Sequence, residues 1–192
     1  STTYGSGLDP YKCFNTSDGT GGAWATDQYS SGIYNGNQQS FDTTGYKGDW
    51  LKIKLPVAIK LTKYSFLRRF DNLNSPNDFK IYGSNDNTIW DILVYKTAIT
   101  YVNQSYQEIV NTDESYYEYF LLVVNKLSST SSLLNFDEWY IYGKEQIQPE
   151  VIDSDYKYLA FPHSGGSETQ TAYSVNFPED TECDILIVGG GG

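Results

Sequence analysis

Apolar and polar residues alternate in short runs along most of the chain, with the period of β-strands. In the run 50–55 (WLKIKL), leucine or isoleucine occupies every second position. This pattern predicts a half-buried strand, because successive side chains of a strand point to opposite faces. Pro56 cannot donate a ladder hydrogen bond and is expected to end that strand. No segment keeps a helical period over three turns, so the sequence predicts an all-β protein.

The apolar positions change phase beyond Pro56. Ile59 and Leu61 keep one parity, whereas Tyr64 and Phe66 fall on the other. One residue inserted into a strand produces such a change, so we expect a β-bulge or a change of sheet in this stretch.

A tight hairpin is predicted around residues 83–87 (GSNDN). Asparagine and aspartate tolerate the left-handed backbone conformations that tight hairpins need. The side chains expected to point inward from its two strands are Phe79, Ile81, Trp90, Ile92 and Val94.

Two later runs complete the predicted sandwich. Residues 119–124 (YFLLVV) are apolar on both parities, which indicates a central strand covered on both faces. Residues 136–143 (FDEWYIYG) are expected to form the last strand. The polar segment 144–154 contains Pro149 and is interpreted as a linker.

The linker separates two expected parts of the chain. The sandwich occupies 1–146, and a second β-rich part occupies 147–192, with short strands expected at 156–161, 171–177 and 184–188. Four glycines directly follow the last of these runs. We therefore expect the second part to be the beginning of a longer glycine-rich segment.

Composition limits the partners of the protein. The net charge is −11, and 13 lysines and arginines among 192 residues leave no basic stripe for a phosphate backbone, so nucleic acid is not an expected partner. The chain contains no run of about 18 apolar residues, so membrane insertion is not expected. The distant Cys13 and Cys183 do not indicate a disulfide framework. We expect Cys13 to be buried and Cys183 to begin a strand.

Several motifs together resemble the F5/8 type C, or discoidin-like, domain. The resemblance covers about residues 5 to 144 and implies a galactose-binding-like jelly-roll β-sandwich. The motifs are Lys12-Cys13-Phe14-Asn15, Asp18-Gly19, Trp24, GDWLKIKLP (48–56), RRFDN (68–72), SPNDFKIYGSNDNTIW (75–90) and FDEWYIYG (136–143).

The resemblance implies ligand binding by loops at one end of the sandwich. Arg69, Asp71 and Asn72 offer donors and acceptors for sugar hydroxyls, and Phe70 or Tyr29 offers an apolar platform. The neighbouring Arg68 would point away from Arg69 in an extended backbone. The alternative is that one arginine forms a structural ion pair and Phe70 is buried. The loop 29–35 is a second candidate, with ordinary tyrosine packing as its alternative.

The resemblance also implies a structural Ca²⁺ site. Its ligands would be Asn15 and Asp18 of the N-terminal loop and Glu138 of the last strand. Oxygen ligands of this kind suit calcium, although the neutral Asn15 would weaken its affinity. The alternative is that Asn15 and Asp18 only form hydrogen bonds within a turn.

No catalytic residue is predicted, and we expect a protein that is not an enzyme. His163 is the single histidine of the chain. Asp137 and Glu138 are adjacent, so on a strand they would face opposite ways and could not form an acid–base pair.

The expected function is attachment to a glycan or another cell-surface ligand. Residues 173–192 (YSVNFPEDTECDILIVGGGG) are similar to the beginning of glycine-rich segments in structural proteins of large DNA viruses and some phages. This similarity implies a virion surface or fibre protein with other structural subunits as partners. The alternatives are a purely structural capsid or fibre subunit, and an extracellular carbohydrate-binding module of a secreted hydrolase.

Overall fold

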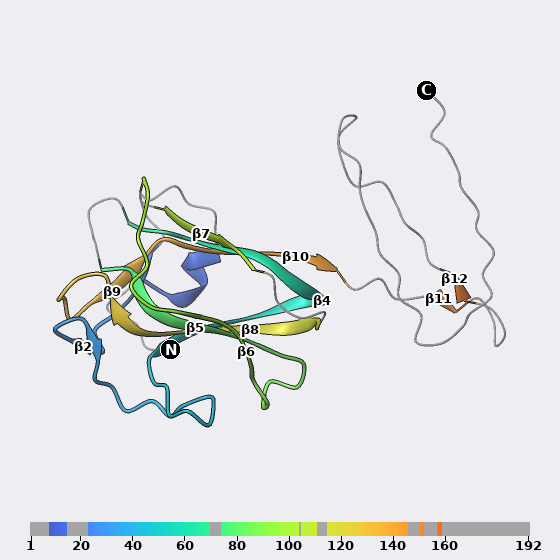
Figure 1. Cartoon of the computed structure of the whole chain (residues 1–192), viewed down its shortest axis with the longest axis horizontal. Coiled ribbons are helices and arrows are strands. Elements are labelled where there is room, and N and C mark those ends of the chain that lie inside the picture. The colour runs from blue at the N-terminus through green and yellow to red at the C-terminus, as the bar shows by residue number, and fades with distance from the viewer. Residues whose placement is uncertain are drawn as a thin grey trace. The chain divides into compact units, whose positions relative to one another are not determined.

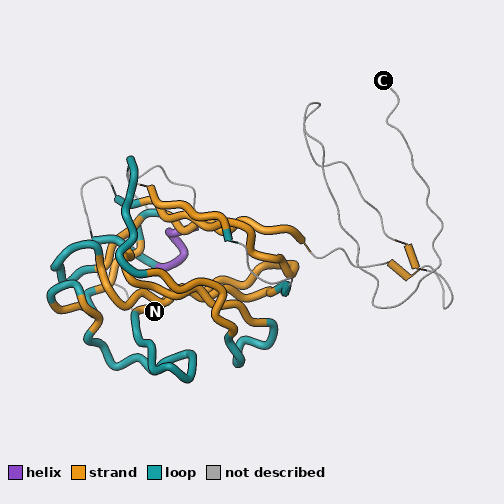
Figure 2. Tube along the Cα trace, in the orientation of Figure 1, coloured by secondary structure: helices purple, strands orange, loops and turns teal. Residues whose placement is uncertain are grey.

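The chain falls into two compact units, Ser1–Gln146 and Ile147–Gly192. Unit 2 contains two short antiparallel strands, β11 (Glu150–Val151) and β12 (Lys157–Tyr158). Strands dominate the described part of the chain (Figure 2). The computed structural model describes residues 8–14, 23–69, 74–103, 105–110, 115–145, 150–151 and 157–158. Of the strands expected beyond residue 154, only the part at 157–158 lies among these residues.

Unit 1 is a sandwich of two antiparallel layers (Figure 1). Layer 1 contains β6 (Asp91–Lys96), β5 (Pro76–Ser84), β8 (Tyr117–Leu127) and the first half of β4 (Asp49–Leu67). Layer 2 contains β10 (Glu138–Glu145), the second half of β4 and β7 (Ser105–Ile109). The remaining elements are the 3₁₀ helix η1 (Pro10–Phe14) and the strands β1 (Trp24–Thr26), β2 (Tyr29–Ser30), β3 (Ile33–Tyr34) and β9 (Leu134–Phe136).

Strand β4 joins the two layers without a break, so the expectation that a strand ends at Pro56 was wrong. Its pairing with β8 is irregular between Lys54 and Ile59, and Pro56 is exposed in that interval. A proline can lie there because no regular ladder bond is required of its nitrogen. The predicted β-bulge is confirmed: Tyr142 of β10 pairs with Lys63 and Gly143 with Leu61, so Thr62 is the extra residue that shifts the alternation between Leu61 and Tyr64. The second half of β4 pairs with β10 and β7.

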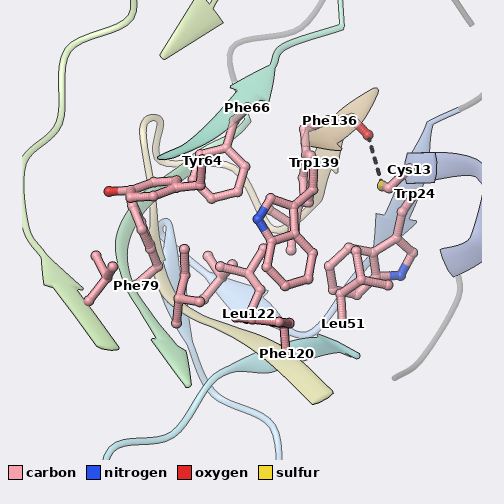
Figure 3. Packing of buried hydrophobic residues seen from close by; sticks show 14 of the residues in the cluster. Cys13, Trp24, Leu51, Tyr64, Phe66, Phe79, Phe120, Leu122, Phe136 and Trp139 are labelled. Atoms are coloured by element: carbon pink, nitrogen blue, oxygen red, sulfur yellow. Dashed lines mark hydrogen bonds between the residues drawn. The ribbon is translucent and has the colours of Figure 1, made fainter. Parts of the chain in front are cut away.

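The core between the layers is rich in aromatic side chains (Figure 3). Leu51, Phe79 and Ile81 are buried in it as predicted, whereas Ile53 and Leu55 are only partly buried. Phe66 contacts Phe79 edge to face, with ring centroids 5.0 Å apart. Such edge-to-face pairs stabilise a core beyond the area they bury.

A second, smaller cluster covers the other face of layer 1. Leu121 and Val123 of β8 pack there with Tyr82, Phe41 and Tyr46. Phe41 and Tyr46 belong to the connection between β3 and β4, residues 35–48, which we call the covering loop (Figure 1). The predicted burial of 119–124 on both faces is confirmed for residues 120–124, and Tyr119 is partly exposed.

The hairpin of β5 and β6 differs from its prediction at two positions, Trp90 and Ile92. Trp90, expected to point inward, packs with Tyr82 in the cluster on the outer face of layer 1. Val94 is buried as expected, but Ile92 is 46% exposed. Ile81 pairs with Val94 and Tyr82 with Ile92, so Leu93 forms a bulge. The bulge shifts the alternation by one residue and turns Ile92 to the outer face.

The segment 136–143 is not one continuous strand. Phe136 ends β9, which pairs with β1, and Glu138 begins β10, which pairs with β4. Asp137 lies in the bend between them, and both Asp137 and Glu138 are buried. The strict alternation expected for this pair therefore does not apply. No helix among the described residues has the length and apolar character to cross a membrane.

Candidate functional site

Asn74 and Ser75, the two described residues before β5, are hydrogen-bonded to the neighbouring segment 128–135. The amide of Ser128 donates to the carbonyl of Ser75 at 2.9 Å, and the amide of Asn135 donates to that of Asn74 at 2.8 Å. Ser129 also donates its hydroxyl to the side chain of Asn74. These bonds fix the backbone directly before β5.

Arg68 directly follows β4 and stacks on an aromatic ring. Its guanidinium carbon lies 4.7 Å from the centre of the Tyr101 ring. The Tyr101 hydroxyl donates to the carbonyl of Pro76 at 2.8 Å, and burial raises the pKa of Tyr101 well above its ordinary value. Tyr101 is thus a neutral, fixed support. A guanidinium stacked in this way keeps planar donors in one orientation.

The buried Nε atom of Arg68 has no hydrogen-bond partner among the described residues. Arg69 is partly exposed at the same end of the sandwich. Phe70, Asp71 and Asn72, the other residues predicted for this loop, lie outside the described residues. Of the ligand-binding residues predicted in this loop, the structure therefore places Arg69, and the other three stay predictions.

Tyr29 is not available as a sugar platform, which corrects the sequence expectation. The residue is only 3% exposed, and its hydroxyl donates to the carbonyl of Val124 at 2.8 Å. Strands β2 and β3 form a tight hairpin around Ser31 and Gly32, both with positive φ. Pairing with the adjacent Tyr34 turns Tyr29 inward, where it belongs to the core.

The residue predicted as a calcium ligand on the last strand, Glu138, is completely buried at the start of β10. Helix η1 packs beside it, where Cys13 is a buried free thiol that donates to the carbonyl of Phe136 at 3.7 Å (Figure 3). Burial raises the pKa of Cys13 far above its ordinary value, and the carboxylates of Glu138 and Asp137 raise it further. The prediction that Cys13 is buried is confirmed.

Asn15 and Asp18 lie outside the described residues, so the full calcium site stays a prediction. Among the residues that are described, no group of three or more histidine, cysteine, aspartate and glutamate side chains could hold a metal ion. Cys13 nevertheless lies close to Glu138. In the sequence, Cys13 is only two residues before Asn15. Asp137 and Glu138 are adjacent buried carboxylates, and carboxylate oxygens are ligands of the kind that calcium takes.

Tyr101 is the residue of this end that sequence reasoning missed. It lies in the connection between β6 and β7, where no alternation or motif distinguishes it. Its role depends on a contact with Arg68, which is distant in the sequence. Residue spacing carries no signal for such a contact.

No family model matches the sequence, and no curated protein is significantly similar to it. Solved structures do share its fold. The family 32 carbohydrate-binding module of Streptococcus pneumoniae EndoD has a TM-score of 0.55 and 13% identity, with 75% of this chain and 90% of that chain covered.

Two modules from Clostridium perfringens also have folds similar to that of this chain. CBM32-3 of a family 31 glycoside hydrolase has a TM-score of 0.55 and 16% identity, covering 74% of this chain and 87% of that one. The family 32 module of NanJ, solved in complex with galactose, has a TM-score of 0.51 and 12% identity, covering 73% and 88%. Unit 1 is therefore a discoidin-like jelly-roll β-sandwich, and the described residues of unit 2 form two short strands.

Proposed function

We propose that unit 1 is a non-enzymatic module that binds a glycan through the end of the sandwich where β4 stops. The observation that carries this proposal is the Arg68 guanidinium, which is held on the ring of Tyr101. Arg69 and the loop residues Phe70, Asp71 and Asn72 follow it directly. Similar folds in carbohydrate-binding modules, one of them bound to galactose, support the same reading.

The chemistry of this end suits a sugar. Vicinal hydroxyls of a pyranose need paired donors and acceptors, which guanidinium, carboxylate and amide groups supply. The apolar face of a sugar ring needs an aromatic platform, for which Phe70 is the remaining candidate of this loop. No general acid and base are required, because binding alone attaches the module to a surface.

A glycan array followed by calorimetry on the full chain tests this proposal. We expect Arg69→Ala and Asn72→Ala to weaken binding of the best array ligand by about tenfold or more, since each removes a hydrogen bond to a charged or polar partner. Lys54 is a cationic residue near the opposite end of β4. Its substitution Lys54→Ala is the matched control and should leave the affinity for this ligand unchanged. An array without hits, or unchanged affinity in both loop variants, would contradict the proposal.

We further propose a structural Ca²⁺ held by Asn15, Asp18 and Glu138. The ion would attach the N-terminal loop to β10, because its oxygen ligands would come from both segments. Adding calcium to protein treated with a chelator should raise the unfolding temperature, because a ligand that binds only the folded state stabilises it. The test uses the unmodified chain, with magnesium as the control ion. An unchanged unfolding temperature at millimolar calcium would refute the site.

In its biological context, we propose that the module belongs to a virion surface or fibre protein and contacts other structural subunits of the particle. Its support is the glycine-rich similarity of residues 173–192. A carbohydrate-binding module of a secreted hydrolase is the rival, because one similar module comes from a glycoside hydrolase. The complete coding sequence separates them: a neighbouring hydrolase domain favours the rival, and a neighbouring fibre or capsid domain favours the virion.

A further inference from the structure

An open groove of about 800 Å³ lies on the outer face of layer 1, beside the covering loop. None of the described residues that line it belongs to the loops 68–75 and 97–104, so it is separate from the end proposed to bind glycan. Three tyrosines, two lysines and one asparagine give it its chemical character. They are Tyr34, Tyr46, Tyr95, Lys47, Lys80 and Asn125.

Tyr46 is held in a fixed position in this groove. Its hydroxyl donates to Oδ1 of Asp78 at 2.6 Å, and the Lys80 ammonium lies 4.6 Å from the centre of its ring. The ring of Tyr95 contacts that of Tyr46 edge to face, with centroids 5.7 Å apart. Because these rings are already ordered, a ligand would lose little affinity to side-chain ordering.

The base of the groove is fixed by a buried ion pair. Lys80 Nζ lies 2.7 Å from Oδ2 of Asp42, and their side chains are 6% and 7% exposed. Asp42 Oδ1 also accepts the amide of Thr44 at 2.9 Å, and Gly45 then turns the chain with a φ of 75°. A residue with a Cβ is strained at that φ, so glycine suits the rim. The covering loop is thus a fixed wall of the groove.

Some of the polar groups of the groove remain able to bind a ligand. Asn125 donates its amide to the carbonyl of Lys47 at 2.7 Å, which leaves its side-chain oxygen as an acceptor. Lys47 is exposed, and Tyr95 is 54% exposed. Aromatic rings beside hydrogen-bonding groups match a molecule that has both an apolar face and hydroxyls.

The charges around the groove balance. Lys47 and Lys80 are positive, and Asp42 and Asp78, which bond to groove residues, are negative. The chain as a whole carries −11, so an anionic ligand gains no long-range attraction. A neutral ligand therefore fits better than a sialylated or sulphated one.

We infer that this groove is a second saccharide-binding site, selective for neutral sugars and built on Tyr46 and Tyr95. It is separate from the proposed glycan-binding end, because the two share none of the described residues. A module with both sites can contact two sugars of one surface, and the combined affinity then exceeds that of either site.

Amide chemical shifts of the ¹⁵N-labelled full chain test this inference. The neutral probes are methyl β-galactoside, N-acetyllactosamine and cellohexaose, and 3′-sialyllactose is the anionic probe. We expect at least one neutral probe to shift the amides of residues 44–47, 95 and 125 more than 3′-sialyllactose does. Tyr95→Ala should weaken this binding by about tenfold, whereas Tyr95→Phe, which keeps the ring, should stay within about threefold.

Two variants separate this inference from the proposed function. Arg68→Ala should leave the groove shifts unchanged, and Tyr142→Ala, an exposed tyrosine of β10, should do the same. Groove shifts that survive Tyr95→Ala, or sugar shifts confined to the loops 68–75 and 97–104, would overturn the second site and leave the first one standing. The absence of groove shifts with every neutral probe would also overturn it.

Discussion

Strand β8 is buried on both faces, but different types of contact cover the two faces. Phe120, Leu122 and Val124 point into the large apolar core between the layers. Leu121 and Val123 point the other way and are covered by the loop 35–48. One strand thus provides an internal comparison between burial under a second sheet and burial under a loop.

Apolar contacts dominate the inner face. The ring of Phe66 meets Phe79 at 5.0 Å and Phe136 at 5.7 Å, both nearly perpendicular. Apolar burial is non-directional, and its free energy follows the area removed from water. This face holds the two layers together, but it does not determine where a surface loop lies.

Directional bonds dominate the outer face. Asp42 of the covering loop accepts from Lys80 at 2.7 Å and from the Tyr82 hydroxyl at 2.8 Å. Burial alone would raise the pKa of Asp42, but hydrogen bonds from Lys80, Thr44 and Tyr82 outweigh it and hold the pKa well below its ordinary value. The comparison teaches that the polar face positions the covering loop, and with it the groove.

The largest expected effect comes from the inner face. Phe79→Ala removes a fully buried ring and leaves a cavity, so the free energy of unfolding should fall by about 3–5 kcal/mol. Phe79→Leu, which keeps most of the volume, should cost less than about 1.5 kcal/mol. Urea denaturation measures both values. Equal losses in the two variants would show that the stability of this core does not depend on the volume of the side chain at position 79.

Breaking the ion pair of the outer face should have the next largest effect. Lys80→Met leaves the Asp42 carboxylate buried without its ammonium partner, which should cost about 3 kcal/mol. The double variant Asp42→Asn with Lys80→Met should recover part of this loss, because the uncompensated charge is gone. A double-mutant cycle in urea measures the coupling, and additive losses would disprove it.

These two faces differ in how well the sequence predicts them. The inner positions Leu51, Phe79 and Ile81 follow from alternation, because a strand places every second residue on the same face. The position of Ile92 does not, since the bulge at Leu93 reverses the alternation locally. The passage of β4 through Pro56 was also missed, because it depends on a change of pairing partner.

The outer face and the sites depend on contacts between distant segments. Lys80 alternates with core residues and looks solvent-facing in the sequence, yet it is 5% exposed because Asp42 covers it. The motif at 68–72 identified the loop that carries Arg68 and Arg69. It could not reveal the stacking of Arg68 on Tyr101, nor the burial of Tyr29, because a pattern along the chain does not record which segments meet.

The edge between the layers should respond to pH. Glu108 of β7 accepts from the Tyr64 and Tyr106 hydroxyls and pairs with Lys96 of β6 at 2.6 Å. Burial would raise the pKa of Glu108, but these three partners lower it below its ordinary value. The unfolded chain therefore takes up a proton first as the pH falls. The stability from the ionised carboxylate is complete above about pH 5 and is lost as the pH falls through the folded pKa.

Glu108→Gln should accordingly cost about 1 kcal/mol at neutral pH and less at acidic pH. Its unfolding free energy should also depend less on pH, although the lowered pKa of Asp42 keeps part of the dependence. Urea denaturation at a series of pH values measures both quantities. Parallel pH profiles for the two proteins would rule out a contribution from Glu108.

The smallest effect is expected where layer 1 is open to water. Lys54 lies 3.5 Å from Glu118 and 5.2 Å from the ring of Tyr119, but the paired side chains are 58% and 40% exposed. Water and salt screen such a pair, so Lys54→Ala should leave the urea midpoint unchanged within error. The same type of ion pair, between Lys80 and Asp42 of the covering loop, is buried, with side chains 6% and 7% exposed. If Lys54→Ala lowered the urea midpoint as much as Lys80→Met, burial of the ion pair could not explain its contribution to stability.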